Sequence, residues 1–212
     1  GCLVTGPFDQ LAAALAAGPT VRTIGLDRTP RGERSAAVLM LLTEAADPEV
    51  TFVTRAETLR RHAGQVALPG GAVDPGDESR FATALREAHE EIGLDPVGVS
   101  LVGELPPLWV PASRYDVTTV VATWRGDGEL WPADPAETGA VHQFPVSALA
   151  APGTRVTAQH PLGFRGPAFV LDDTFIWGLT AHLVDWVLDL AGWARPWDKS
   201  RVVDIPERFL RD

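Results

Sequence analysis

Apolar and polar residues along this chain follow two periods, one of strands and one of helices. Six short, largely apolar segments bounded by turn-forming residues are typical of strands. They are 36–43, 50–54, 65–68, 97–105, 117–124 and 141–144. The first of them, AAVLMLLT, is too short to cross a membrane, so it predicts a strand buried in a sheet.

Three other segments carry apolar residues at helical spacing. The segment 8–17 ends at Gly18-Pro19, and the segment 79–92 has Ser79 as its cap and Gly93 as its stop. In the third segment, 177–190, the apolar side chains form one stripe. Together these elements predict an α+β fold in which a mixed sheet is sandwiched between helices, an α/β/α sandwich.

Composition adds limits to this picture. A chain of 212 residues with 45% hydrophobic content can bury a core as one folded domain. Its only cysteine, Cys2, excludes an intrachain disulfide and suits a reducing compartment. Since no apolar run is long enough to cross a membrane, we expect a soluble, cytoplasmic protein without a membrane partner.

The net charge of −10 argues against a nucleic-acid partner, because a negative protein repels polyanions over distance. A small phosphorylated substrate remains compatible with it. Local arginines and bound divalent cations can reverse the sign of the field at one site.

Three glutamates share one face of the predicted helix 79–92. Glu90 and Glu91 follow Glu87 by three and four residues, which places the carboxylates together. Arg86, four residues before Glu90, can hold that carboxylate in one rotamer. A solvated acidic face is the simpler interpretation of three glutamates alone. Mg²⁺ or Mn²⁺, completed by substrate phosphates, would relieve the repulsion between them.

The surrounding residues favour the metal site. From Gly71 the chain continues through Glu78 to the segment REAHEEIGL, residues 86–94. This resembles the signature of Nudix hydrolases: Gly, five residues, Glu, seven residues, then R-E-apolar-x-E-E-x-G-apolar. Six fixed identities at fixed spacing arise by chance on the order of 10⁻⁸ times per start position. The resemblance implies a Nudix fold and metal-dependent hydrolysis of a diphosphate, with Glu87, Glu90 and Glu91 as catalytic metal ligands.

The loop before the helix is one residue longer than the common signature. Counted from Gly71, Asp77 takes the position of the signature glutamate; counted back from Arg86, Glu78 takes it. Because helices are rigid and loops absorb insertions, we expect Glu78 to be the equivalent, a further catalytic residue, and Asp77 to belong to the loop.

The segment before the signature indicates a substrate. Arg55-Ala56, Arg60, Gly64 and Leu68-Pro69-Gly70-Gly71 are each separated by three residues. This spacing is similar to a motif of the coenzyme A pyrophosphatase subfamily of Nudix hydrolases, L-L-T-x-R-[SA], three residues, R, three residues, G, three residues, F-P-G-G. The resemblance implies hydrolysis of coenzyme A, with acyl or oxidised forms as further substrates, to 4′-phosphopantetheine and adenosine 3′,5′-bisphosphate.

The charge of that segment agrees with such a substrate. Arg55, Arg60, Arg61 and His62 supply four potential cations in eight residues of an acidic chain. Arginine is suited to bidentate phosphate contacts, and coenzyme A carries a 3′-phosphate beside its diphosphate. We expect these four residues, with Gly70 and Gly71, to bind substrate; on composition alone, a solvated basic loop is the alternative.

The resemblance covers residues 34–192, the expected Nudix hydrolase domain. Residues 1–33 are then an N-terminal helix and connector packed on it, and 193–212 a C-terminal tail. The water that attacks phosphorus needs a base, either a helix glutamate or the loop residue Glu137, although a loop carboxylate in water is the commoner case.

Other functions fit parts of the pattern. The substrate could instead be ADP-ribose, NADH or a nucleoside triphosphate, since the signature gives the reaction and not the substrate. An isopentenyl-diphosphate isomerase of the same fold would need a pocket cysteine, for which Cys2 is badly placed. A non-catalytic nucleotide-binding module would be expected to lose the signature carboxylates, which this chain keeps.

Overall fold

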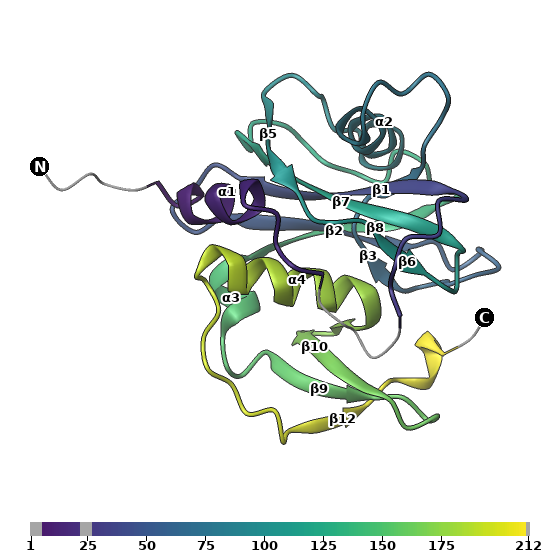
Figure 1. Ribbon diagram of the computed structural model, residues 1–212. Coiled ribbons are helices and arrows are strands. Elements are labelled where there is room, and N and C mark those ends of the chain that lie inside the picture. Colours follow the sequence, from purple (N-terminus) through teal and green to yellow (C-terminus); the bar gives the residue numbers. More distant parts are fainter. Residues whose placement is uncertain (1–5, 22–26, 211–212) are drawn as a thin grey trace, which may run out of the picture.

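The computed structural model describes residues 6–21 and 27–210, and within them it contains a larger and a smaller β-sheet with helices between and outside (Figure 1). The larger sheet consists of β1 (Ser35–Thr43), β2 (Glu49–Arg55), β3 (Val66–Ala67), β4 (Gly70–Ala72), β5 (Val99–Glu104), β6 (Leu108–Val110), β7 (Tyr115–Trp124) and β8 (Thr138–Pro145). The smaller sheet consists of β9 (Arg155–Gln159), β10 (Arg165–Leu171), β11 (Thr174–Ile176) and β12 (Val202–Asp204). The helices are α1 (Asp9–Ala16), α2 (Arg80–Ile92), α3 (Val146–Ala150), α4 (Gly178–Ala191) and the 3₁₀ turn η1 (Glu207–Phe209).

The centre of the larger sheet is the parallel pair β1 and β7. Their register runs from Ser35 opposite Asp116 to Thr43 opposite Trp124. The principal strand order is β3-β2-β1-β7-β5, with β2 and β5 antiparallel to their neighbours β1 and β7. The sheet is therefore mixed, as the sequence predicted.

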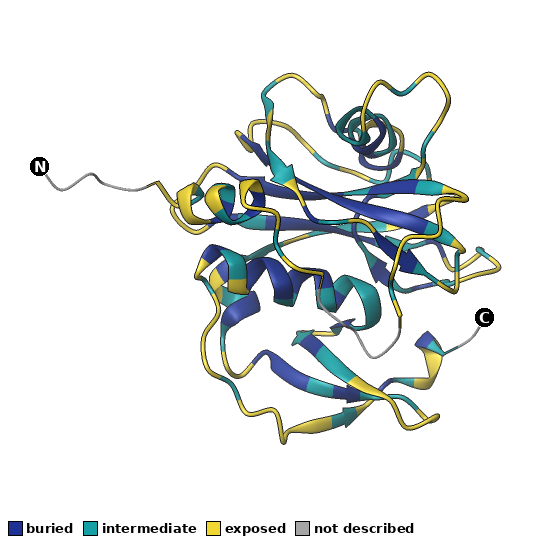
Figure 2. Cartoon of the chain, viewed as in Figure 1, coloured by how far each residue is buried: buried dark blue, intermediate teal, exposed yellow. Residues whose placement is uncertain are grey.

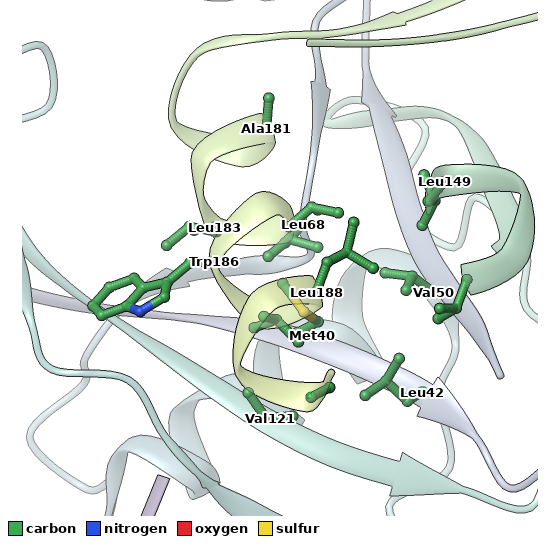
Figure 3. Close-up of a cluster of buried hydrophobic side chains, with 14 of the residues drawn as sticks. Met40, Leu42, Val50, Leu68, Val121, Leu149, Ala181, Leu183, Trp186 and Leu188 are labelled. Carbon is green, nitrogen blue, oxygen red and sulfur yellow. The ribbon is translucent and has the colours of Figure 1, made fainter. Parts of the chain in front are cut away.

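Strand β1 is buried on both faces, and its residues alternate between two cores. Leu39 and Leu41 pack with Ala84, Ala88 and other apolar residues of α2. Met40 and Leu42 lie on the other face, in the core that also contains Trp186 and Leu188 of α4 (Figure 3). This alternation follows from the two-residue period of a strand and explains the continuous apolar run AAVLMLL.

The order of layers is therefore α2, larger sheet, α1 with α4, and smaller sheet (Figure 1). Figure 2 shows the sheet and the facing side of α4 as largely buried, with exposed residues in the loops. The predicted α/β/α sandwich is confirmed, and the three helices expected at 8–17, 79–92 and 177–190 all form.

The smaller sheet was not predicted. Its strand β12 lies in the segment expected to be a C-terminal tail, yet it pairs in parallel with β9, with Val202 opposite Thr157. Ile205 and Phe209 then join Val156, Ala168 and Phe175 in a third core. A boundary at residue 192 would therefore cut through a sheet.

The remaining predictions on the chain ends have mixed outcomes. Helix α1 packs between the larger sheet and α4, since Leu11 and Leu15 are buried in the core that both contribute to. Cys2 lies outside the described residues. No helix in the described part of the chain is long and apolar enough to cross a membrane.

Candidate active site

Helix α2 carries the three signature glutamates. It begins where the Ser79 hydroxyl accepts a hydrogen bond from Ala82 N at 3.0 Å, and it ends at Gly93, whose φ of 69° lies in the left-handed region. Both caps agree with the prediction. The apolar face of the helix lies on the sheet, so that Glu87 and Glu91 turn toward β4 and Glu90 toward solvent.

Two glycines allow α2 and β1 to come this close to β4. A side chain at Gly71 would place its Cβ 2.5 Å from the Glu87 carboxyl carbon, and one at Gly70 would place it 2.3 Å from the Ala37 carbonyl oxygen. The contact at Gly70 is with backbone, so that position needs glycine, whereas a side chain at Gly71 would push the end of the flexible Glu87 side chain aside. The glycine pair therefore brings the backbone of β4 against the Glu87 carboxylate.

Glu91 is the most buried of the three glutamates, with 8% of its surface exposed. Its Oε2 accepts a hydrogen bond of 3.4 Å from Gly70 N. Burial, and next the charge of Glu87, raise the pKa of Glu91 to about 8. Burial, and next the charge of Glu90, also raise the pKa of Glu87. These neighbours thus repel one another as the sequence implied, and a bound cation would relieve both carboxylates.

Arg86 is surrounded by acidic side chains. Its Nε and Nη2 donate to the two oxygens of Asp77 at 3.1 and 3.0 Å, and its Nη1 donates to Glu87 at 3.1 Å and Glu90 at 3.3 Å. Asp74 lies 3.5 Å away. Arg86 therefore orients Glu90, as predicted, and also Glu87.

Asp77, which was expected to belong to the loop, pairs with Arg86, whereas the signature position before Arg86 was expected to be filled by Glu78. Besides the Arg86 pair, Asp77 Oδ2 accepts from Thr83 Oγ1 at 2.8 Å and from Asp74 N at 2.9 Å. The paired Arg86 guanidinium holds the pKa of Asp77 well below its usual range. Glu78 is exposed. These contacts favour the count from Gly71, in which Asp77 takes the signature position and the extra residue lies on the helix side of it.

The carboxylates do not form a ready-made metal cage. In the described ranges, no three His, Cys, Asp or Glu side chains are grouped closely enough to hold a metal by themselves. Glu90 points to Arg86, and its side chain is 53% exposed. The arrangement is suited to a cation that is completed by ligands from a substrate.

The cationic segment 55–64, called the arm below, begins beside this site. Arg55 is partly buried at the irregular end of β2, and its charge lowers the pKa of Glu91, though less than burial raises it. The arm closes on itself through a 3.0 Å bond from Gly64 N to the Arg55 carbonyl. Arg60 and Arg61 are exposed on it. His62, with φ of 55°, adopts a conformation that is uncommon for residues with a side chain. The structure thus places Arg55 where its charge acts on Glu91, and it leaves Arg60 and Arg61 exposed to solvent.

Glu137 also reaches the site from far along the sequence. Its carbonyl accepts a 2.8 Å hydrogen bond from Ala56 N, which ties its loop to the first turn of the arm. Its exposed carboxylate contributes to the raised pKa of both Glu87 and Glu91. The structure therefore brings Glu137, which is distant in the sequence, close enough to Glu87 and Glu91 for its charge to act on them.

Comparison with known proteins agrees with this geometry. The family model of the NUDIX domain matches residues 33–162. The "Uncharacterized Nudix hydrolase NudL" of Cronobacter sakazakii is 37% identical over 166 residues, covering 75% of this chain and 83% of that protein. The protein of the same name from Escherichia coli strain K12 is 36% identical over the same shares.

Solved structures with more distant similarity include two proteins with named ligands or activities. An Ap4A hydrolase of C. elegans, in a binary complex, has a TM-score of 0.44 and 19% identity, covering 53% of this chain and 81% of that chain. The NUDIX domain of Shewanella oneidensis NrtR, complexed with ADP ribose, has a TM-score of 0.42 and 21% identity, covering 64% and 83%. From the family match and the two bacterial relatives, this chain belongs to the Nudix hydrolases.

Proposed function

We propose that this Nudix hydrolase cleaves the diphosphate of coenzyme A to 4′-phosphopantetheine and adenosine 3′,5′-bisphosphate. The observation that carries the proposal is the position of Arg55, the first residue of the cationic arm, whose charge acts on the buried carboxylate of Glu91. Hydrolysis of coenzyme A would need carboxylates that hold a divalent cation at the diphosphate, and positively charged side chains near the 3′-phosphate would strengthen binding. In this protein the glutamates of α2 and the cationic arm come close to each other at Glu91 and Arg55.

A divalent cation, Mg²⁺ or Mn²⁺, would be held by Glu87, Glu90 and Glu91. The fit rests on the raised pKa of Glu87 and Glu91 and on the missing side chain of Gly71, next to the Glu87 carboxylate. When bound, the cation supplies neutralisation of the charge that builds up on the diphosphate. Arg86 orients Glu87 and Glu90 toward this task, and Glu137 would accept the proton of the attacking water.

The arm supplies the argument for coenzyme A over a plain nucleoside diphosphate. Arg60 and Arg61 are exposed, and their charges are not used up in ion pairs among the described residues. Arginine binds phosphate oxygens in bidentate fashion, and the 3′-phosphate distinguishes coenzyme A from ADP-ribose and NADH. His62, held by the turn of the arm, would join them.

A second candidate is a Nudix diphosphatase for ADP-ribose, NADH or a nucleoside triphosphate. The solved relatives named above bind ADP ribose or act on Ap4A, and the carboxylate helix of this chain would serve any such substrate. This candidate leaves the four cations of the arm without a specific role.

The experiment is a hydrolysis screen of the purified protein with coenzyme A, ADP-ribose, NADH and nucleoside triphosphates, with products identified by mass. We expect the highest kcat/KM for coenzyme A with Mg²⁺ or Mn²⁺, no turnover in chelator, and recovery when metal is returned. Preference for another diphosphate would replace the substrate and keep the enzyme class. Full turnover without metal would refute the role of the three glutamates.

A further inference from the structure

A cleft lies on the opposite side of the larger sheet from α2. It has a volume of about 890 Å³ and is lined by residues of α4, of β9 and β10, and of the segment 194–199 that leads to β12. Ligand sites in proteins span about 300–1,000 Å³. The two helices α2 and α4 cover opposite faces of the sheet (Figure 1), so this cleft is separate from the catalytic glutamates.

The base of the cleft is an arginine that the fold has fully enclosed. Arg155 is 1% exposed, and its Nη2 donates to Asp185 of α4. Its guanidinium carbon lies 4.4 Å from the ring centre of Phe169 and 4.5 Å from that of Trp197. Its Nε is shielded from solvent and has no hydrogen-bond partner within the described part of the chain. Two rings and one carboxylate therefore fix this cation in a single orientation.

The charge around this arginine is opposite to that of the protein. The charged side chains that line the cleft, among the described residues, are Arg155, Arg165, Arg195, Lys199, Asp185 and Asp189. Four cations and two carboxylates leave a local charge of +2, whereas the whole chain carries −10. A structural ion pair would need only Arg155 and Asp185. The surplus of cations remains even though both aspartates also have other interactions within the protein.

Cationic side chains at the rim of the cleft are accessible to a ligand. Arg195 and Lys199 are exposed, and Lys199 Nζ lies 6.0 Å from the ring centre of Trp197. Arg165 is held by a 3.0 Å hydrogen bond from its Nη2 to Gln159 Oε1. Exposed cations around an aromatic ring and over an oriented arginine are suited to an anion whose oxygens can accept several hydrogen bonds at once.

We propose that this cleft is a second, non-catalytic binding site for a small phosphorylated anion, with Arg165, Arg195 and Lys199 as its ligands over the fixed Arg155. The shared chemistry is a multiply charged phosphate group, supplied either by an inorganic phosphate or by a nucleotide. The site does not depend on which diphosphate the catalytic site cleaves.

Isothermal titration calorimetry tests this site on the whole protein in chelator, without divalent metal. The probes are inorganic pyrophosphate, ADP and, as the uncharged control, adenosine. The test protein is the double variant Arg195→Gln/Lys199→Gln, which keeps Arg155 and its partners. The matched control is Arg114→Gln/Arg125→Gln, which removes the same charge from exposed positions outside the cleft.

We expect the unmodified protein and the matched control to bind a phosphorylated probe equally. The test variant should bind it at least about tenfold more weakly, as expected for the loss of charge-assisted contacts. Tighter binding of ADP than of pyrophosphate would identify a nucleotide, and equal binding a phosphate group alone. Equal affinity in all three proteins, binding of adenosine as strong as that of ADP, or no binding of either phosphorylated probe would overturn the proposal. Unchanged hydrolase activity and melting temperature in the test variant would verify that its fold is intact.

Discussion

Two arginines of this protein sit in opposite electrostatic surroundings. Arg86 lies among four carboxylates of the described chain, Asp74, Asp77, Glu87 and Glu90, so its neighbourhood keeps a net charge of −3. Arg155 has Asp185 as its carboxylate partner and two aromatic rings beside it, in a cleft with a surplus of cations.

The comparison shows that an arginine by itself does not indicate what a site binds. Arg86 holds carboxylates in place and leaves an acidic site that a cation would complete. Arg155 anchors a cationic cleft that an anion would complete. Whether a site binds a cation or an anion depends on the sign of the charge that remains around the arginine after it has been paired.

The largest effect should follow from removing a carboxylate at the acidic site. Glu90→Gln should lower kcat by on the order of 10²-fold or more, because a metal ligand acts on the charge of the transition state. Steady-state kinetics with saturating metal measure this effect, with circular dichroism to verify folding. Near-normal kcat in a folded variant would remove Glu90 from the site.

The arm should show a smaller effect that depends on the substrate. A charge-assisted contact contributes about 1.5–3 kcal/mol, or roughly ten- to a hundred-fold in kcat/KM. Arg60→Ala should therefore penalise coenzyme A more than dephospho-coenzyme A, which lacks the 3′-phosphate. The measurement is kcat/KM for both substrates in variants of Arg55, Arg60, Arg61 and His62, and it distinguishes recognition of the 3′-phosphate from two alternatives. Equal losses for both substrates would indicate a general diphosphate clamp, and unchanged values a solvated loop.

Asp77 and Glu78 are adjacent acids with different surroundings, so they form a matched pair. Asp77→Asn removes the charge that holds Arg86 and should lower kcat/KM about tenfold, as is usual for residues that support metal ligands. Glu78→Gln, the same change at an exposed position, should have little effect. The reverse order of effects would restore Glu78 to the signature position.

The stability that Asp77 contributes should depend on pH. The pKa of Asp77 is depressed in the folded protein, so its stabilisation is present above the usual value of 3.8 and disappears as pH falls through the lower folded value. The variant Asp77→Asn should melt below the unmodified protein at pH 7, and the gap should narrow below about pH 4. A gap that stays constant with pH would mean that charge is not its cause.

The smallest effect concerns the stability of the metal-free protein. The pKa of Glu91 is raised to about 8, so its ionisation destabilises the fold increasingly as pH rises from the usual 4.5 to 8. In chelator at pH 9, Glu91→Gln should therefore raise the Tm by about 3 °C or more, and at pH 5 it should change it little. Glu104→Gln, at an exposed position of β5, is the control. A Tm that falls at pH 9 would show that Glu91 is stabilised in its charged form.

Much of the catalytic helix follows from the sequence alone. Helix geometry, which is rigid and local, sets the shared face of Glu87, Glu90 and Glu91. It also sets the Ser79 cap and the Gly93 stop, all within the fifteen residues 79–93. The burial of β1 on both faces also follows from its uninterrupted apolar run.

Only the tertiary structure decided the rest, because it depends on contacts between distant segments. Counting along a loop could not distinguish Asp77 from Glu78, since loops absorb an extra residue on either side. The pairing of β2 with β8 brings Arg55 and the loop of Glu137 together. As a result, the charges of Arg55 and Glu137 both act on Glu91. Arg155 lies in a short strand without a clear apolar period, and sequence favours an exposed arginine there. In the fold this arginine is buried instead. Phe169 and Trp197 pack against its guanidinium and Asp185 pairs with its charge, and the three residues come from separate segments.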